Sequence, residues 1–416
     1  MHSFTLLFLL MLTLSVAVQM WLEQRQLSHV GAHRGAVPDA FAEQITLEAH
    51  QKAADYTMTK VRLSRIELIY SAVILLGLTL GGGINWLDGL WAGLELGTIW
   101  GGVAFLLSLT LLTTLLDLPF SLYRTFRIEQ RFGFNKSTPG LFVADLLKGL
   151  VLMLLIGVPL AALVLWLMAS MGDNWWLYVW GVWSGFTLLM MWAYPAVIAP
   201  LFNKFTPLED ASLRSRIDAL LGRCGFKSNG IFVMDGSRRS AHGNAYFSGL
   251  GSNKRIVFFD TLLESLSAEE VEAVLAHELG HFRRNHIKKR IVLMMVMSLA
   301  GLALLGWLMK QAWFFSALGV DTPSVHAALA LFMMVLPVFT FFLSPLMAMS
   351  MRKHEFEADD FAAEHAESRD LISALVKLYK ENASTLTPDH LYSAFHDSHP
   401  PAPVRIAHLS STMSEG

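Results

Sequence analysis

Seven apolar runs along the chain are close to or longer than the roughly 20 residues that cross a bilayer as a helix. The first run is longer than the hydrophobic region of a signal peptide and has no basic segment before it, so we interpret it as a retained anchor. The pattern therefore predicts a protein that spans a membrane seven times. The runs lie at 3–22, 66–84, 98–120, 141–169, 175–200, 291–309 and 327–349.

Basic residues gather in the connections after the first, third and fifth runs. The alternate connections, 85–97, 170–174 and 310–326, contain only Lys310. By the positive-inside rule the N-terminus is expected outside and the C-terminus in the cytoplasm. We divide the chain into five helices with cytoplasmic loops at 1–200, a cytoplasmic region at 201–290, two more helices at 291–349, and a C-terminal region at 350–416.

The region 201–290 has the pattern of a folded domain. The residues from Thr206 to Glu209 form a capping box, which predicts a helix that ends near Gly225. Short β-branched and aromatic runs at 230–234, 244–248 and 255–259 predict a small sheet, with a hairpin loop at 249–253.

A second capping box, at 267–270, predicts a helix that begins near Ala268 and could continue without a break into the run at 291–309. This helix contains His277, Glu278 and His281 in an H-E-x-x-H motif. Two imidazoles four residues apart project from one helix face and can bind one zinc ion, and the glutamate can accept a proton from a zinc-bound water. Burying these three polar groups without a metal would be costly, so we favour the metal site over a structural role.

Catalytic zinc needs a third protein ligand, and the best source is the acidic segment at 352–359. Glu355 and Asp359 share one helix face, so we predict Glu355 as the ligand and Asp359 as the acceptor that orients a ligand imidazole. His354 and Glu357 remain alternative ligands. His286, five residues after the second histidine of the motif, is interpreted as part of a basic helix face.

The composition agrees with a membrane protein and argues against nucleic-acid binding. Hydrophobic residues make up 54% of the chain and charged residues 16%, and the net charge is −2 with a pI near 6.7. There is no bulk positive charge to hold nucleic acid. The single cysteine, Cys224, cannot form an intramolecular disulfide and is interpreted as a buried residue.

Several longer motifs, in the same order, resemble the type I CAAX prenyl endopeptidases, a family of membrane zinc proteases of the gluzincin kind. These are PFSLYRTF at 119–126, GFNK at 133–136, IAPLFNKF at 198–205, RSAHGNAY at 239–246, the zinc motif, the run from Glu355 to Asp359, and HPP at 399–401. One departure is Met351, where the family commonly has serine.

The resemblance implies a mainly α-helical fold: a barrel of seven transmembrane helices around a chamber, with a zinc protease domain that carries a small sheet. It implies one Zn²⁺ ion per chain and a peptide or protein substrate, either prenylated at its C-terminus or otherwise hydrophobic. It also implies that His399 and Arg405 reach the site; from spacing alone they would be a turn residue and a surface arginine. We expect Asn244, Ala245 and the nearby His242 to form an edge strand on which a peptide binds.

Two other classes are weighed against this interpretation. An intramembrane protease would carry its zinc motif inside an apolar run, whereas charged residues flank this one. A transporter or receptor with a structural metal would bind zinc without hydrolysing peptides. The compact loops and the lack of an evident ER retrieval ending favour a bacterial cytoplasmic membrane over the ER membrane.

Overall fold

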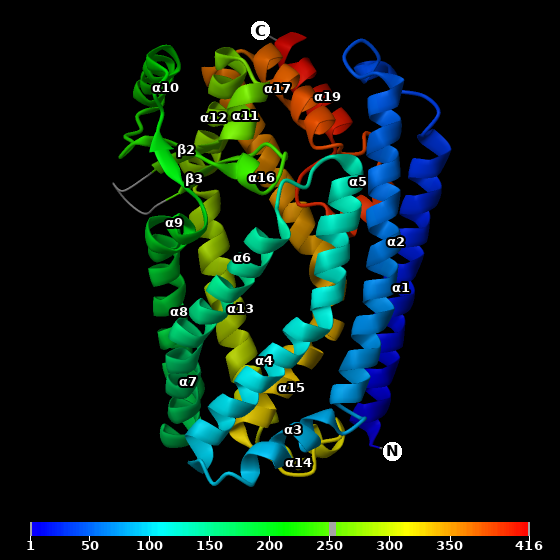
Figure 1. Cartoon of the computed structure of the whole chain (residues 1–416), viewed down its shortest axis with the longest axis vertical. Helices are drawn as coiled ribbons and strands as arrows, with labels where there is room; N and C mark the ends of the chain where they lie inside the picture. Colours follow the sequence, from blue (N-terminus) through cyan, green and yellow to red (C-terminus); the bar gives the residue numbers. More distant parts are fainter. Residues whose placement is uncertain (1, 249–254, 415–416) are drawn as a thin grey trace.

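The computed structural model describes residues 2–248 and 255–414 and consists mostly of long helices that stand side by side around a common axis (Figure 1). The predicted hairpin loop at 249–253 lies outside the described residues. The helices that contain or connect the apolar runs are α1 (Ser3–His33), α2 (Leu47–Leu78), α3 (Gly83–Ala92), α4 (Gly97–Tyr123), α5 (Gln130–Phe132), α6 (Pro139–Leu152), α7 (Val158–Ser170), α8 (Trp175–Ala193), α9 (Ala199–Phe202), α13 (His286–Leu308), α14 (Ala312–Ser316), α15 (Val325–Thr340) and α16 (Ser344–His365).

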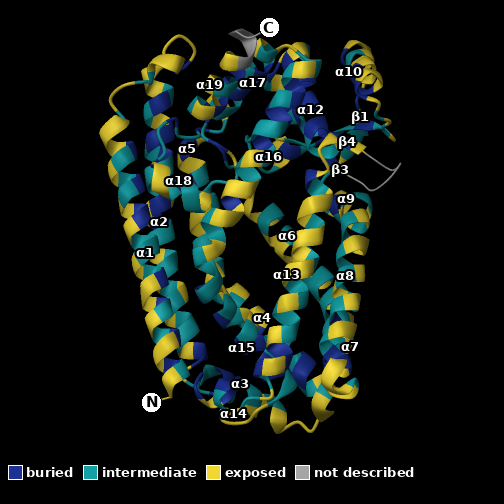
Figure 2. Cartoon of the chain, turned by 180° about the vertical axis from the view of Figure 1, so that it is seen from behind, coloured by how far each residue is buried: buried dark blue, intermediate teal, exposed yellow. Residues whose placement is uncertain are grey.

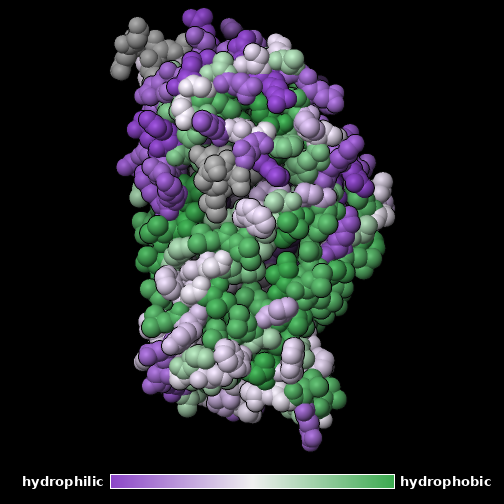
Figure 3. Space-filling view, turned by 90° about the vertical axis from the view of Figure 1, so that its left-hand side faces the viewer, coloured by the Kyte–Doolittle hydropathy of each residue, from purple (hydrophilic) through white to green (hydrophobic). Residues whose placement is uncertain are grey.

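Six helices of the described chain are long and apolar enough to cross a membrane, and a seventh span arises if α2 and α3 are counted as one broken span bent by 51°. The break follows Leu78, inside the run predicted at 66–84, where Gly82 adopts a positive φ of 79°. Large apolar side chains cover the outside of the helices, such as Leu155, which is 68% exposed. A broad hydrophobic band accordingly lies between two more polar ends (Figure 3), as expected of a multi-pass membrane protein.

Short π-helical turns interrupt three of the long helices. They are η2 (Arg124–Glu129), η3 (Met153–Gly157) and η5 (Tyr194–Ile198). Such turns insert one residue into the helical repeat and change the direction of the side chains that follow. The first of them contains Glu129, whose carboxylate contacts His242, just before β3.

Buried residues concentrate at the two ends of the helical bundle (Figure 2). One core joins α10 (Ala211–Cys224), the sheet, α12 (Ala268–Arg283), α16 and α17 (Ser368–Glu381). Cys224 is buried in this core, as predicted. A second core joins α1, α3, α4, α7, α8, α13, α14 and α15 at the opposite end. The remaining helices of the polar end are α11 (Asp260–Ser265), α18 (His390–His396) and α19 (Ala402–Ser414).

The small predicted sheet is present and has four strands in the order β1-β2-β4-β3. The strands are β1 (Phe205–Pro207), β2 (Ile231–Met234), β3 (Ala245–Ser248) and β4 (Arg255–Phe259). β2 and β4 pair parallel, whereas β1 pairs antiparallel with β2 and β3 antiparallel with β4. β3 therefore lies at the edge of the sheet.

The helix predicted to begin at Thr206 begins later, at Ala211. Thr206 instead lies in β1, opposite Val233, because strand pairing uses the backbone groups that a helix would need. The observed N-cap is Asp210, whose carboxylate accepts a hydrogen bond from the Leu213 amide at 2.9 Å. The helix ends as predicted, with Gly225 in the left-handed region (φ 69°).

The helix with the H-E-x-x-H motif begins at Ala268 and is closed by the predicted capping box of Ser267 and Glu270. The sequence had allowed this helix to continue into the next membrane helix, but the structure shows a break between the two. Asn285 adopts a positive φ of 58°, ending α12 and beginning α13 in a new direction. Asparagine tolerates this conformation better than most residues.

Gly280 lets α12 approach α16 very closely. A Cβ atom at this position would lie 2.9 Å from the Ala358 Cα and 3.1 Å from the Ala358 carbonyl oxygen. Only glycine fits without moving one helix away from the other. Gly280 lies between the two histidines of the motif, and Ala358 lies in the acidic segment of α16. The close contact of these two residues therefore brings the candidate ligands together.

Candidate metal centre

Three predicted ligands meet between α12 and α16. His277 and His281 come from α12, and their Nε2 atoms lie 3.3 Å apart. Glu355 Oε2 lies 3.5 Å from His277 Nε2, and the other carboxylate oxygen, Glu355 Oε1, lies 3.3 Å from His281 Nε2. Among the described residues, these three form the group of His, Cys, Asp or Glu side chains able to share one ion.

The donor set fits a tetrahedral metal. Ligand bonds of about 2.0–2.1 Å at tetrahedral angles separate neighbouring ligand atoms by roughly 3.3–3.4 Å, close to the separations among the three donors. Glu355 and His277 are almost completely buried, yet Glu355 Oε2 has no hydrogen-bond partner. A buried carboxylate oxygen without a partner is costly, and a cation at this point would satisfy it.

Asp359 and Arg405 support His277 from behind. Asp359 Oδ1 lies 2.8 Å from His277 Nδ1, so the imidazole can donate there and leave Nε2 free for a metal. The Arg405 guanidinium forms a two-pronged contact with the same carboxylate, at 2.9 Å and 2.5 Å. Its Nη1 atom also lies 3.8 Å from Glu355. Arg405 is buried and also lines the adjacent cavity.

The surroundings of His277 favour proton binding when no metal is present. Burial and the Arg405 guanidinium lower the pKa of His277, but the carboxylates of Asp359 and Glu355 outweigh them and raise it to about 9. A metal ligand must be unprotonated, so a metal that binds here displaces a proton. The apparent metal affinity of the site therefore falls as the pH drops below that value.

A second chain of contacts supports His281. Its Nδ1 atom lies 3.0 Å from His286 Nδ1, and His286 Nε2 lies 2.8 Å from Glu357 Oε2. If His281 offers Nε2 to a metal, its Nδ1–H donates to His286, which in turn donates to Glu357. The interpretation of His286 as a basic-face residue missed this arrangement. His354 stacks on His286 with ring centroids 4.1 Å apart, behind the ligand group.

Glu278 lines a cavity of about 330 Å³ beside the three ligands. The edge-strand residues Asn244 and Ala245 and the side chain of His399 line the same cavity. His399 is 64% exposed, and its Nε2 atom lies 3.5 Å from Glu355 Oε1. The cavity thus brings the Glu278 carboxylate, an exposed imidazole and a strand edge to one place.

His242 lies just before the edge strand and fixes it to the rest of the molecule. Its Nδ1 atom lies 3.1 Å from Asn382 Oδ1, and its Nε2 atom 3.3 Å from Glu129 Oε2. Tyr56 donates to the other oxygen of Glu129 at 2.6 Å. The imidazole also stacks on Phe134. No motif or spacing pointed to Glu129, Tyr56 or Asn382, because these contacts join segments far apart in the chain.

Replacing Arg405 tests its role at the site. We expect Arg405→Ala to lower kcat by about 10²–10³ through loss of a donor at the cavity. We also expect a loss of about 3–5 kcal/mol in the free energy of unfolding, because Asp359 would stay buried without its partner. Metal content, thermal unfolding and kinetics measured on one preparation separate the two effects. Full activity with unchanged stability would contradict both roles. Arg405→Lys keeps the positive charge but cannot form the two-pronged contact with Asp359, so its activity and stability should be intermediate.

Family models match nearly the whole chain. A model described as "CAAX prenyl protease N-terminal, five membrane helices" matches residues 26–204, and the model of peptidase family M48 matches residues 207–413. Together the two models cover the metal centre and the membrane helices from α2 onwards.

Similar proteins agree with these models. CAAX prenyl protease 1 homolog of Oryza sativa is 40% identical over 75% of this chain and 74% of its own length. The human CAAX prenyl protease 1 homolog is 33% identical over 93% and 91%. The crystal structure of S. mikatae Ste24p superposes with a TM-score of 0.92 at 31% identity, covering 98% of this chain and 99% of that one. The chain is therefore a membrane metallopeptidase that belongs to the CAAX prenyl protease family, within peptidase family M48.

Proposed function

We propose that this protein is a zinc-dependent endopeptidase that removes a C-terminal tripeptide after a prenylated cysteine. The observation that carries the proposal is the spacing of His277, His281 and Glu355, which suits a tetrahedral ion, beside the free carboxylate of Glu278. The names of the relatives support the substrate class. The known peptidase family supports hydrolysis rather than transport.

When bound, zinc would acidify the attacking water and polarise the scissile carbonyl. Glu278 then accepts the proton of that water and delivers it to the leaving amine, so no covalent acyl-enzyme is needed. His399 and Arg405 both line the cavity and can donate hydrogen bonds to the developing oxyanion. The peptide itself would lie along β3, which leaves one edge open to it.

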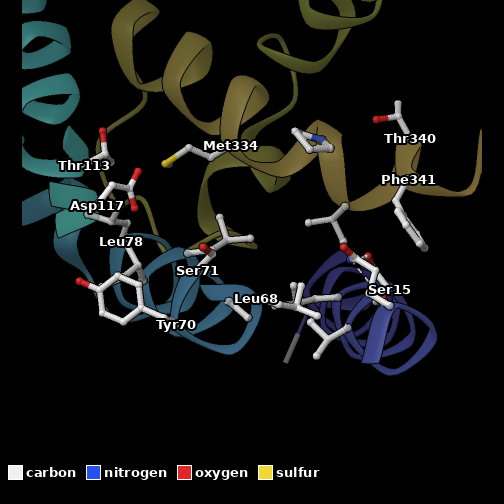
Figure 4. A pocket seen from close by; sticks show the side chains of 18 of the residues that line it. Ser15, Leu68, Tyr70, Ser71, Leu78, Thr113, Asp117, Met334, Thr340 and Phe341 are labelled. Atoms are coloured by element: carbon white, nitrogen blue, oxygen red, sulfur yellow. Dashed lines mark hydrogen bonds between the residues drawn. The ribbon is translucent and has the colours of Figure 1, made fainter. Parts of the chain in front are cut away.

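A second cavity supports an apolar substrate. It has a volume of about 580 Å³ and lies between α1, α2, α4 and α15, within the apolar part of the helices (Figure 4). Twelve of its twenty lining residues are apolar, among them five leucines, Val338 and Phe341, and the other eight include Asp117 and Tyr70. A cavity of this composition suits a hydrocarbon chain better than a polar peptide.

The proposal is tested with the purified full-length protein in liposomes. A farnesylated peptide that ends in cysteine and three further residues should be cut after the cysteine, as mass spectrometry would show. Removing metal with a chelator should abolish the cleavage, and added Zn²⁺ should restore it. Cleavage that survives complete metal removal would contradict the mechanism, and cleavage only at other bonds would contradict the substrate class.

We also propose that the catalytic end faces the cytoplasm, from the basic residues on alternate connections. Lys310 and Asp173 form an ion pair at 2.7 Å. This contact supports placing the connections 170–174 and 310–326 on the same side of the membrane, opposite the catalytic cavity. A cysteine introduced at Asp173, in a chain whose buried Cys224 is replaced by alanine, should react with an impermeant thiol reagent only from outside. Labelling only from the cytoplasm would reverse the orientation, and a reporter fused after Gly416 gives an independent check.

A further inference from the structure

Lys60 on α2 presents a cation to a polar cavity of about 420 Å³. Its Nζ atom lies 4.0 Å from the centre of the Tyr56 ring, a contact that positions the ammonium group. In the part of the chain that the structure describes, no carboxylate lies within 4 Å of this nitrogen. Glu129, close by, is already engaged by Tyr56 and His242. An ammonium group held at the cavity wall in this way would be stabilised by an anionic ligand.

The Lys60 cavity adjoins the catalytic cavity. Tyr379, Ser384 and His399 line both of them. A ligand that lies beside Glu278 can therefore extend past His399 towards Lys60. Two cavities that adjoin in this way could hold successive residues of one extended peptide.

The direction of the peptide decides which of its ends reaches Lys60. β3 already pairs antiparallel with β4 on its inner side. A peptide that pairs antiparallel on the free side of β3 runs from the Ser248 end to the Ala245 end, so its C-terminal part leaves the strand near His242. His242 contacts Glu129, and Glu129 accepts a hydrogen bond from Tyr56, the residue whose ring supports Lys60.

We propose that Lys60 binds the free C-terminal carboxylate of the peptide substrate, and that the cavity around it is the subsite for the end of the leaving segment. This inference rests on the proposed function, in which that end lies three residues beyond the scissile bond. Three extended residues span about 10 Å, which takes the carboxylate beyond the catalytic cavity.

The other groups of the cavity agree with this assignment. The hydroxyls of Ser384 and Thr385 line its wall and can donate hydrogen bonds to an anion. Asp397 also lines the cavity and would repel a carboxylate beside it, so the favourable place is the wall formed by Lys60. Such a subsite would direct cleavage to a fixed distance from the chain end.

The experiment compares two farnesylated peptides of one sequence, one with a free C-terminal carboxylate and one with a C-terminal carboxamide. We expect the wild-type protein to cleave the acid with a kcat/KM about 10–100-fold higher, the range of one charge-assisted hydrogen bond. Lys60→Gln should lose this preference by lowering kcat/KM for the acid alone, and Lys60→Arg should keep most of it. Lys52→Gln is the control, because Lys52 is an exposed lysine of the same helix that does not line the cavity.

Cleavage of the amide shows in each case that the variant is folded and holds its metal. Equal cleavage of both peptides by the wild type would overturn the subsite, as would a Lys60→Gln variant that still prefers the acid. An equal loss on both peptides would also overturn it, since Lys60 would then act on structure or catalysis in general. If the wild type cleaves neither peptide, the proposed function fails and the subsite fails with it.

Discussion

Glu278→Gln is expected to abolish nearly all peptide hydrolysis while leaving the metal content unchanged. The amide has almost the shape of the carboxylate but cannot accept the proton of the attacking water, and general-base catalysis typically contributes about 10²–10⁴-fold to the rate. Glu278 is not one of the three residues grouped around the ion site, so the ligands stay in place. The measurement is kcat on the farnesylated peptide, together with the metal stoichiometry of the same sample.

A matched control lies on the same helix. Glu269 is in the first turn of α12, about two helical turns before the motif, and forms a surface ion pair with Arg216. Glu269→Gln should keep wild-type turnover, because exposed ion pairs contribute little to stability. Normal turnover by purified Glu278→Gln would remove the general base from the mechanism.

Glu355→Ala is expected to lose the metal itself. The carboxylate is buried between the two imidazoles, and two histidines alone bind zinc more weakly than three protein ligands. The loss in affinity should exceed the roughly 10–100-fold cost of removing a residue that only supports a ligand. Metal titration of the metal-free protein gives this affinity directly, and hydrolysis should fall in parallel.

Glu364→Ala provides the comparison for this prediction. Glu364 is exposed on the same helix and belongs to none of the ligand contacts, so its removal should change neither affinity nor rate. Stoichiometric metal and intact activity in Glu355→Ala would place the third ligand elsewhere. The role of Asp359 would then need a new explanation as well.

The centre of the site could be predicted because its residues are close in sequence. His277, Glu278 and His281 share one turn of a helix, and the helical repeat alone puts the two imidazoles on one face. The choice of Glu355 over Glu357 also follows from helical spacing, once Asp359 is recognised as its partner. Local geometry explains each of the two groups separately, and the structure brings the groups together through the contact of α12 with α16.

Contacts between distant segments could not be predicted in this way. Tyr56 and His242 reach Glu129 across 73 and 113 residues of sequence, and no spacing rule connects them. The false capping box at Thr206 failed for the same reason, since pairing with a distant strand outweighed the local preference. The break at Asn285 is an intermediate case. Asparagine tolerates a positive φ, so the sequence held a local sign of the break, which the expectation of a continuous helix did not take into account.

The first helix binds the segment that precedes the last two helices. Arg25 of α1 forms an ion pair with Asp389 at 2.8 Å, and the side chain of Gln26 accepts a hydrogen bond from the Asp389 amide at 2.7 Å. Beyond this clamp the chain leads to His399 and Arg405, which complete the surroundings of the metal. A ribosome that has finished the three ligands has therefore not yet made the residues that finish the site. Placement of the three ligands and completion of their surroundings are therefore separate steps in the synthesis of the chain.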